Sequence, residues 1–192
     1  PVEGRDPDEI YAILDTFDDV LASRSPGYFS QITFDGYAPE ATSGGPPGIM
    51  GFGYDIRSDT PAFSVDVTEG DDLTVENADY GVIFTSTLAG NMGKTIGDTV
   101  TMNAQGYSFP VTIVGIADYG IDQIWIDWER LALETHNTIG SPPPPNQYFT
   151  TVTIGDTNTE VDVLGMDLDI LVGAGITSRY FEQLLQVNDG EF

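Results

Sequence analysis

The chain has 192 residues, and its 31 acidic side chains outnumber its 6 basic ones, giving a formal charge of −25. This balance excludes binding to nucleic-acid phosphates, which requires a basic surface, and an anionic membrane surface would repel the chain. Hydrophobic residues make up 40% of the sequence and aromatic residues 11%, so the chain can form a core. It contains no cysteine, which excludes disulfides, thiolate metal sites and a cysteine nucleophile.

No apolar stretch approaches the roughly 20 residues that a membrane-spanning helix needs. The chain also starts at Pro1 without a methionine or an apolar leader. We therefore expect any targeting or anchoring segment to lie outside this chain, which we interpret as an excised or processed domain.

The first expected element is a helix over 7–22. Asp6 provides an N-cap, Pro7 stands at the first helical position, and apolar residues recur at helical spacing as far as Leu21. Ser25-Pro26-Gly27 is typical of a loop. The alternation over 28–34 then predicts a strand, and a Gly/Pro-rich loop leads to a return strand near 49–56.

The middle of the chain predicts strands joined by tight turns and two short helices. A buried strand over 81–85 runs into a short helix over 86–91, and Asp127 can cap a helix that ends before Gly140. β-rich runs at 99–103 and 108–116 predict a hairpin. The four prolines over 142–145 predict a stiff spacer, with a ligand for a proline-binding module as the alternative.

An internal similarity suggests a repeat. The segment YFSQIT at 28–33 recurs as YFTTVT at 148–153, and each follows a proline-containing loop after a helix. We therefore predict a first domain over 1–140 and a second, partial repeat over 141–192, a hairpin plus a short helix packed on the first. In the second copy the turn is expected at Asp156-Thr157-Asn158. Chance similarity between two hairpins remains the alternative.

Candidate catalytic and metal-binding patterns are weak. The single histidine, His136, is placed to cap a helix, and no Gly-x-Ser-x-Gly nucleophile turn exists. Residues 156–162 lack the glycine and the final glutamate of a calcium loop, and Gly93-Lys94-Thr95 lacks the spacing of a phosphate loop. The sequence therefore predicts no catalytic residue, no cofactor and no structural metal site.

Six residues stand out for other roles. Gly97 permits a turn with positive φ, and Asp98 can accept backbone N–H groups there, which predicts a structural turn. Asp71 and Asp72 are candidates for contact with a partner. Trp125 and Trp128 are further candidates, although their apolar neighbours favour packing in the core.

Three segments carry a resemblance to a known family. GVIFTSTLA at 81–89, GKTIGDTV at 93–100 and FPVTIVGIA at 109–117 resemble, in this order, the periplasmic core domain of MacB/FtsX-like ABC-transporter permeases. Glu69-Gly70 and the segment 177–192 resemble flanking parts of the family, with Glu191 in place of the usual arginine. The resemblance is good over about 49–135 and partial at both ends.

The resemblance implies an α+β fold of antiparallel hairpins and a small mixed sheet with a few amphipathic helices. It also implies a non-catalytic domain, held outside the cytoplasmic membrane by flanking transmembrane helices. Such a domain receives substrate or binds an adaptor protein, and it is coupled to a cognate ABC ATPase through the full-length permease. The acidity fits a soluble extracytoplasmic domain.

Two other classes of function stay open. A secreted or surface β-rich binding module would have a similar composition, with Tyr28, Tyr37, Tyr107 and Tyr148 contacting sugars. A hydrolase that uses buried carboxylates is a weaker option, because acid–base chemistry needs two carboxyl groups with different environments in one cleft.

Overall fold

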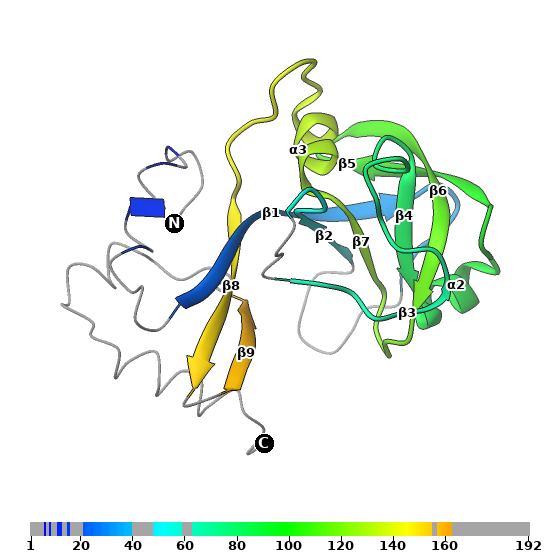
Figure 1. The fold of residues 1–192 in the computed structure, drawn as a ribbon. Coiled ribbons are helices and arrows are strands. Elements are labelled where there is room, and N and C mark those ends of the chain that lie inside the picture. Colours follow the sequence, from blue (N-terminus) through cyan, green and yellow to red (C-terminus); the bar gives the residue numbers. More distant parts are fainter. Residues whose placement is uncertain are drawn as a thin grey trace.

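The computed structural model describes residues 6, 8, 11–12, 15, 21–39, 48–58, 63–154 and 157–162. These residues form one mixed sheet and two helices, an α+β arrangement (Figure 1). In chain order the elements are β1 (Leu21–Phe34), β2 (Ile49–Tyr54), β3 (Val67–Gly70), β4 (Gly81–Thr85), α2 (Ser86–Met92), β5 (Thr99–Ala104), β6 (Tyr107–Ala117), β7 (Gln123–Asp127), α3 (Trp128–His136), β8 (Gln147–Ile154) and β9 (Thr157–Asp162).

Six of the strands close into a ring, which we call the barrel. The pairs β1–β2, β7–β4, β6–β5 and β5–β1 are antiparallel, whereas β2–β7 and β4–β6 are parallel. Each of these strands therefore has a neighbour on both edges along part of its length. β3 adds to β6 beyond the end of β5. A closed ring removes the exposed strand edges that favour aggregation.

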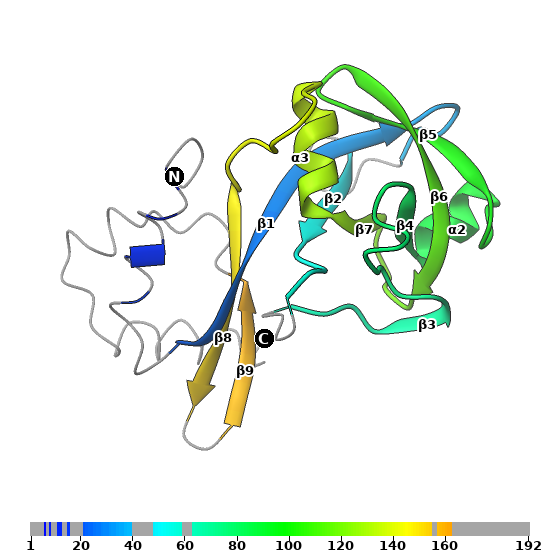
Figure 2. The ribbon, with the colours of Figure 1, turned by 45° about the horizontal axis from the view of Figure 1, so that its top comes forward.

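The first half of β1 leaves the barrel and pairs with β8, which pairs in turn with β9 (Figure 2). We call residues 21–27 of β1 together with β8 and β9 the arm. β8 and β5 pair with the same edge of β1, at its two ends. Between them the side-chain amide of Asn146 takes the place of a strand, because its Oδ1 accepts from Phe29 N at 2.7 Å and its Nδ2 donates to Phe29 O at 2.9 Å.

Two apolar clusters hold these parts together. The larger fills the barrel and includes Ile32, Phe84 and Met102, all at most 1% exposed. The smaller lies outside the barrel and joins it to the arm, with the Phe149 ring of β8 stacked on Phe63 at a centroid distance of 4.5 Å. Burial of aromatic and aliphatic surface on this scale is the main force that stabilises a fold.

Both helices begin at a side-chain cap. Thr85 Oγ1 accepts from Leu88 N at the start of α2, and the Asp127 side chain accepts from Arg130 N at the start of α3. The start of α3 lies directly on β2, where a Cβ at Gly53 would come within 2.5 Å of Trp128 Cα. Glycine is therefore required at this close approach. Neither helix, among the residues that the structure describes, is long and apolar enough to cross a membrane.

The prediction for the N-terminal segment is partly wrong. Asp8 N donates to Asp6 Oδ1 at 2.9 Å, as an N-cap requires, and Asp8, Tyr11 and Ala12 are helical. However, β1 already begins at Leu21, and Ser25-Pro26-Gly27 lies within the strand rather than in a loop. Pairing with β8 overrides the local loop signal at this point.

The predicted turn of the second copy is also misplaced. Ile154 of β8 lies opposite Thr157 of β9, so Thr157 and Asn158 belong to the strand and not to the turn. Both Tyr-Phe segments lie in strands that pair antiparallel with the next strand, β1 with β2 and β8 with β9. The rest of the second copy, including its expected short helix after 162, lies outside the described residues, and the repeat stays a prediction.

Candidate functional site

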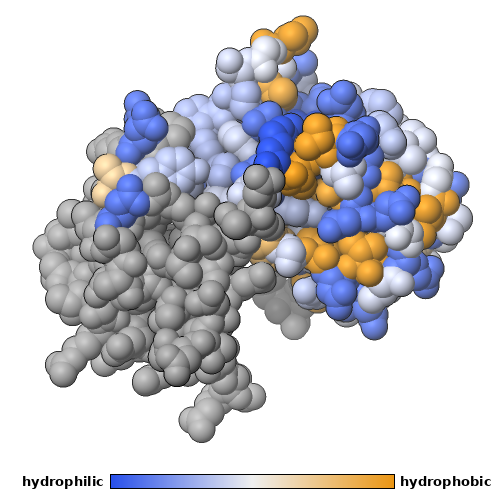
Figure 3. Space-filling view, viewed as in Figure 1, coloured by the Kyte–Doolittle hydropathy of each residue, from blue (hydrophilic) through white to orange (hydrophobic). Residues whose placement is uncertain are grey.

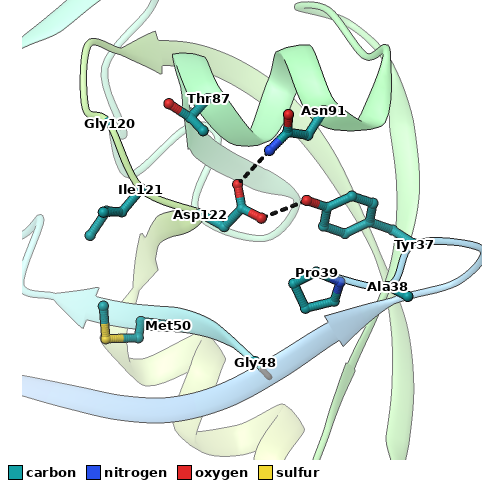
Figure 4. Close-up of a pocket in the computed structure, with 10 residues that line it drawn as sticks. All are labelled: Tyr37, Ala38, Pro39, Gly48, Met50, Thr87, Asn91, Gly120, Ile121 and Asp122. Atoms are coloured by element: carbon teal, nitrogen blue, oxygen red, sulfur yellow. Dashed lines mark hydrogen bonds between the residues drawn. The ribbon is translucent and has the colours of Figure 1, made fainter. Parts of the chain in front are cut away.

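A pocket of about 560 Å³ opens at one end of the barrel (Figure 4). Its walls come from four segments that lie apart in the sequence: the turn after β1, the start of β2, α2, and the connection between β6 and β7. The lining residues are Tyr37, Ala38, Pro39, Gly48, Met50, Thr87, Asn91, Gly120, Ile121 and Asp122. A pocket of this size with mixed polar and apolar walls is typical of a binding site.

The carboxylate of Asp122 is the charged group of this pocket. Its Oδ2 accepts from the Tyr37 hydroxyl at 2.5 Å, and its Oδ1 accepts from Asn91 Nδ2 at 3.1 Å. Both donors are neutral, and the described residues of the lining include no lysine, arginine or histidine. The negative charge of Asp122 is therefore held in place without a cation at its side.

The connection over 118–122 is fastened to α2 by side chains. Ser86 Oγ donates to Asp118 Oδ1 at 2.9 Å, Thr87 Oγ1 donates to Tyr119 O at 2.8 Å, and Thr85 Oγ1 donates to Ile121 O at 2.7 Å. These bonds fix the backbone while the side chains of Tyr119 and Ile121 stay 46% exposed. The wall of the pocket is therefore preorganised and partly apolar.

A second pocket, of about 460 Å³, lies beside α3 at the opposite end of the barrel. Its central charges are paired within the chain: Arg57 binds both oxygens of Asp127, at 2.5 and 3.0 Å, and also approaches Glu129 at 3.2 Å. Hydrogen bonding to Asp127 raises the pKa of Arg57. This pocket is thus bordered by an ion-pair network whose evident role is to secure the start of α3.

The two predicted tryptophan contacts lie inside the molecule. Trp125 is 2% exposed and Trp128 is 9% exposed, in the outer and inner apolar clusters respectively. The ring of Tyr119 lies over Trp125 at a centroid distance of 5.0 Å. Neither indole is available to a partner in this structure, and core packing, which the neighbouring isoleucines favoured, describes both.

Asp71 and Asp72 are exposed in the turn that leaves β3. Asp72 also has a structural task, because its Oδ1 accepts from Leu73 N at 2.7 Å and from the Tyr54 hydroxyl at 3.1 Å. Burial raises the pKa of Tyr54, and the nearby charge of Asp72 raises it further. Asp71, whose N donates to Val114 O, projects from the same turn. The pair lies outside both pockets.

The Gly97-Asp98 turn joins α2 to β5. Gly97 has φ of +89°, and no heavy atom lies within 4 Å of the position that a Cβ would take. Asp98 Oδ2 accepts from Thr95 N at 3.0 Å, and Asp98 N donates to Thr95 O at 3.1 Å. The positive φ is therefore the reason for glycine at position 97, since there is room for a side chain.

The tyrosines considered for sugar binding do not all lie on the surface. Tyr28 and Tyr148 are 4% and 2% exposed, so two of the four tyrosines considered for sugar binding lie in the interior. The Tyr28 hydroxyl is 2.7 Å from Nε2 of His136, the last residue of α3. Among the described residues, no group of three or more His, Asp or Glu side chains could hold a metal ion.

Sequence reasoning missed Asn91 and Asp122 and gave Tyr37 a different role. These residues come from separate segments, and only folding places their polar atoms around one carboxylate. The surface elsewhere is mixed, with apolar side chains interrupted by hydrophilic ones over β3, β4 and β6 (Figure 3).

Comparison with known proteins gave one family and a group of solved structures. The model of the MacB-like periplasmic core domain matches residues 4–167. The extracellular domain of the noncanonic ABC-type transporter YknZ from Gram-positive bacteria is similar with a TM-score of 0.50 and 15% identity, over 78% of this chain and 74% of that one. The periplasmic region of MacB from Actinobacillus actinomycetemcomitans has a TM-score of 0.48 and 14% identity, over 92% and 82% of the two chains. A search of curated protein sequences gave no match.

Proposed function

We propose a function for this chain, which belongs to the MacB-like periplasmic core domain family, the extracytoplasmic domains of ABC-type transporter permeases. The domain binds a substrate or a partner protein, and this binding is coupled to ATP-driven movement of the flanking transmembrane helices. The family match over 4–167 carries this proposal, because it spans every strand of the barrel and the arm. The proposed partners are the cognate ATPase, through the full-length permease, and an extracytoplasmic adaptor or substrate protein.

The continuity of β1 supports the mechanical part of the proposal. One strand of 14 residues belongs to the arm at its start and to the barrel at its end. The Phe149–Phe63 stack and the Asn146 amide hold the two parts together at the point where β1 passes between them. A displacement of the arm would therefore move the barrel with it.

The composition of the two pockets supports a binding role over a catalytic one. Among the described residues that line the pocket at the end of the barrel, Asp122 is the one carboxylate, whereas hydrolysis by paired carboxylates needs two with different environments. In the pocket beside α3, Asp127 and Glu129 pair with Arg57, and Glu134 pairs with Arg130. We propose that the domain has no hydrolytic activity.

The test uses the intact permease with its ATPase in lipid nanodiscs. These 192 residues contain no cysteine, so, in a permease and ATPase whose other accessible cysteines have been replaced, Tyr107→Cys on the exposed β5–β6 hairpin gives a single site for an environment-sensitive fluorophore. Coupling predicts that trapping the ATPase with ATP and vanadate changes the emission. The matched control is the same labelled permease with an ATPase variant that cannot bind ATP. Identical spectra with and without trapping would contradict the proposal.

A further inference from the structure

We propose that the pocket around Asp122 binds a segment of a partner protein in which a lysine or arginine stands next to an apolar side chain. The inference rests on the proposed partner binding and names the site and the chemistry of the partner. Three observations carry it: the hydrogen bonds of the carboxylate, the apolar side chains beside it, and the rigidity of the 118–122 connection.

The state of Asp122 calls for a cation. A carboxylate can accept about four hydrogen bonds, and Asp122 receives one from Tyr37 and one from Asn91. The contrast with Asp127 is informative, because that buried carboxylate is neutralised by both terminal nitrogens of Arg57. The carboxylate of Asp122 therefore retains part of its accepting capacity, which suits an ammonium or guanidinium group from outside.

The apolar side chains beside Asp122 favour an apolar neighbour of that cation. Met50 is 36% exposed and Ile121 is 46% exposed, and both line the same hollow as Asp122 (Figure 4). Its volume of about 560 Å³ accommodates more than a single side chain. A leucine beside a lysine would cover the apolar wall while the ammonium reaches the carboxylate.

The charge and rigidity of the chain favour such a partner further. The net charge of −25 attracts basic segments over long range and repels acidic ones. Because α2 already fixes the 118–122 connection, little conformational entropy is lost when the pocket is filled. A protein segment is favoured over a small amine, since the exposed side chains of Ile121 and Met50 extend the contact beyond one cation.

The experiment is an NMR titration of the ¹⁵N-labelled 192-residue chain with three peptides. Acetyl-Gly-Leu-Lys-Gly amide is the probe, and the Leu-Glu and Ser-Lys forms are the controls. We expect the Leu-Lys peptide to shift amides of 118–122, Asn91 and Met50, and both controls to bind at least several-fold more weakly. Asp122→Asn should weaken the Leu-Lys peptide about tenfold, as expected for a lost charged hydrogen bond. Asp79→Asn, which removes the same charge at the other end of the barrel, should leave binding within about twofold.

Four results would overturn the proposal: no shift with any peptide, shifts confined to another surface, equal binding of the Leu-Glu peptide, or unchanged binding by Asp122→Asn with an otherwise native spectrum. Saturation of the same amides by n-butylammonium as tightly as by the peptide would overturn the assignment to a protein segment. The labelled-permease experiment is independent of these results. A nucleotide-dependent signal in the permease together with a negative peptide titration would reject this pocket and keep the proposed function.

Discussion

The barrel and the arm share a strand but are built by different contacts. The barrel is closed by pairs between strands and filled by one apolar cluster, and its hairpin β5–β6 joins neighbours in sequence. The arm depends on the pairing of β1 with β8. Next to this pairing, Asn146, the residue before β8, is hydrogen-bonded to Phe29, which lies 117 positions earlier in the chain. The barrel is therefore specified largely by its own packing, whereas the arm exists because a distant strand pairs with β1.

The largest expected effects on stability come from two closely packed glycines, Gly53 in the barrel and Gly27 in the arm. Gly53→Ala places a Cβ within 2.5 Å of Trp128 Cα, a backbone atom of α3, and should destabilise the chain by about 3 kcal/mol. Gly27→Ala meets the edge of the Phe149 ring, which can shift, so about 1–2 kcal/mol is expected. Urea unfolding measures both. Gly48→Ala, whose nearest contact would be 3.7 Å from Gln31, is the control, and equal losses at Gly53 and Gly48 would contradict the account.

The ion pair at the start of α3 stabilises the barrel and not the arm. Asp127→Ala removes the cap of α3 and the partner of Arg57 together, and the carboxylate is 1% exposed. We expect a loss of about 2–3 kcal/mol in the free energy of unfolding. Glu129→Gln, which removes the more exposed partner of Arg57, should cost less than about 1 kcal/mol. A larger loss of unfolding free energy for Glu129→Gln than for Asp127→Ala would show that Glu129, and not Asp127, is the main partner of Arg57.

The turn before β5 tests local geometry alone. Gly97→Val puts a β-branched residue at φ of +89°, where space is open but the backbone is unfavourable, and about 1–2 kcal/mol should be lost. Gly90→Ala, inside α2 with nothing within 4 Å, should instead stabilise by about 0.5–1 kcal/mol. Thermal melts of the two variants should move in opposite directions, and a Gly97→Val melt like that of the native chain would show that the position is ordinary.

The smallest effect concerns one buried tyrosine in each region. Burial raises the pKa of Tyr54 in the barrel, with a further contribution from Asp72, and burial likewise raises the pKa of Tyr148 in the arm. Above pH 10 the unfolded chain loses these protons and the folded chain keeps them, so stability should fall as the pH rises, by up to about 1 kcal/mol per pH unit for each tyrosine.

Tyr54→Phe and Tyr148→Phe should each remove part of this alkaline slope. Urea unfolding at a series of pH values above 9 measures the slope. A slope that is the same in the native chain and in both variants would show that other groups cause it.

Much of the barrel could be predicted from sequence because its signals are local. The buried strand before Ser86 and the cap at Asp127 are set by residues within a few positions, and the structure places these elements within a residue or two of the expected bounds. β1 was only half predicted. Pro26 and Gly27 are typical loop residues within their own window, yet Pro26 lies opposite Tyr148, and Gly27 leaves room for the ring of Phe149.

The candidate site was harder to predict for the same reason. Asp122 draws its donors from Tyr37 and Asn91, which lie on other elements, and no spacing rule joins three such residues. In a chain with 31 acidic side chains, a single carboxylate does not stand out. What distinguishes Asp122 is that no cation stands among the described residues that line its pocket, which is a property of the fold.

β1 makes the barrel and the arm one cooperative unit, and amide hydrogen exchange of the 192-residue chain measures whether the two parts open together. The hydrogen-bonded amides of β1 on the two sides of Gly27 belong to one strand, with Pro26 contributing no N–H. We predict that the amides within 23–25 that are hydrogen-bonded to β8 and the hydrogen-bonded amides of 28–34 exchange with opening free energies within about 1 kcal/mol of each other. Rapid exchange of those bonded amides in 23–25 beside strong protection over 28–34 would show that the arm opens independently of the barrel.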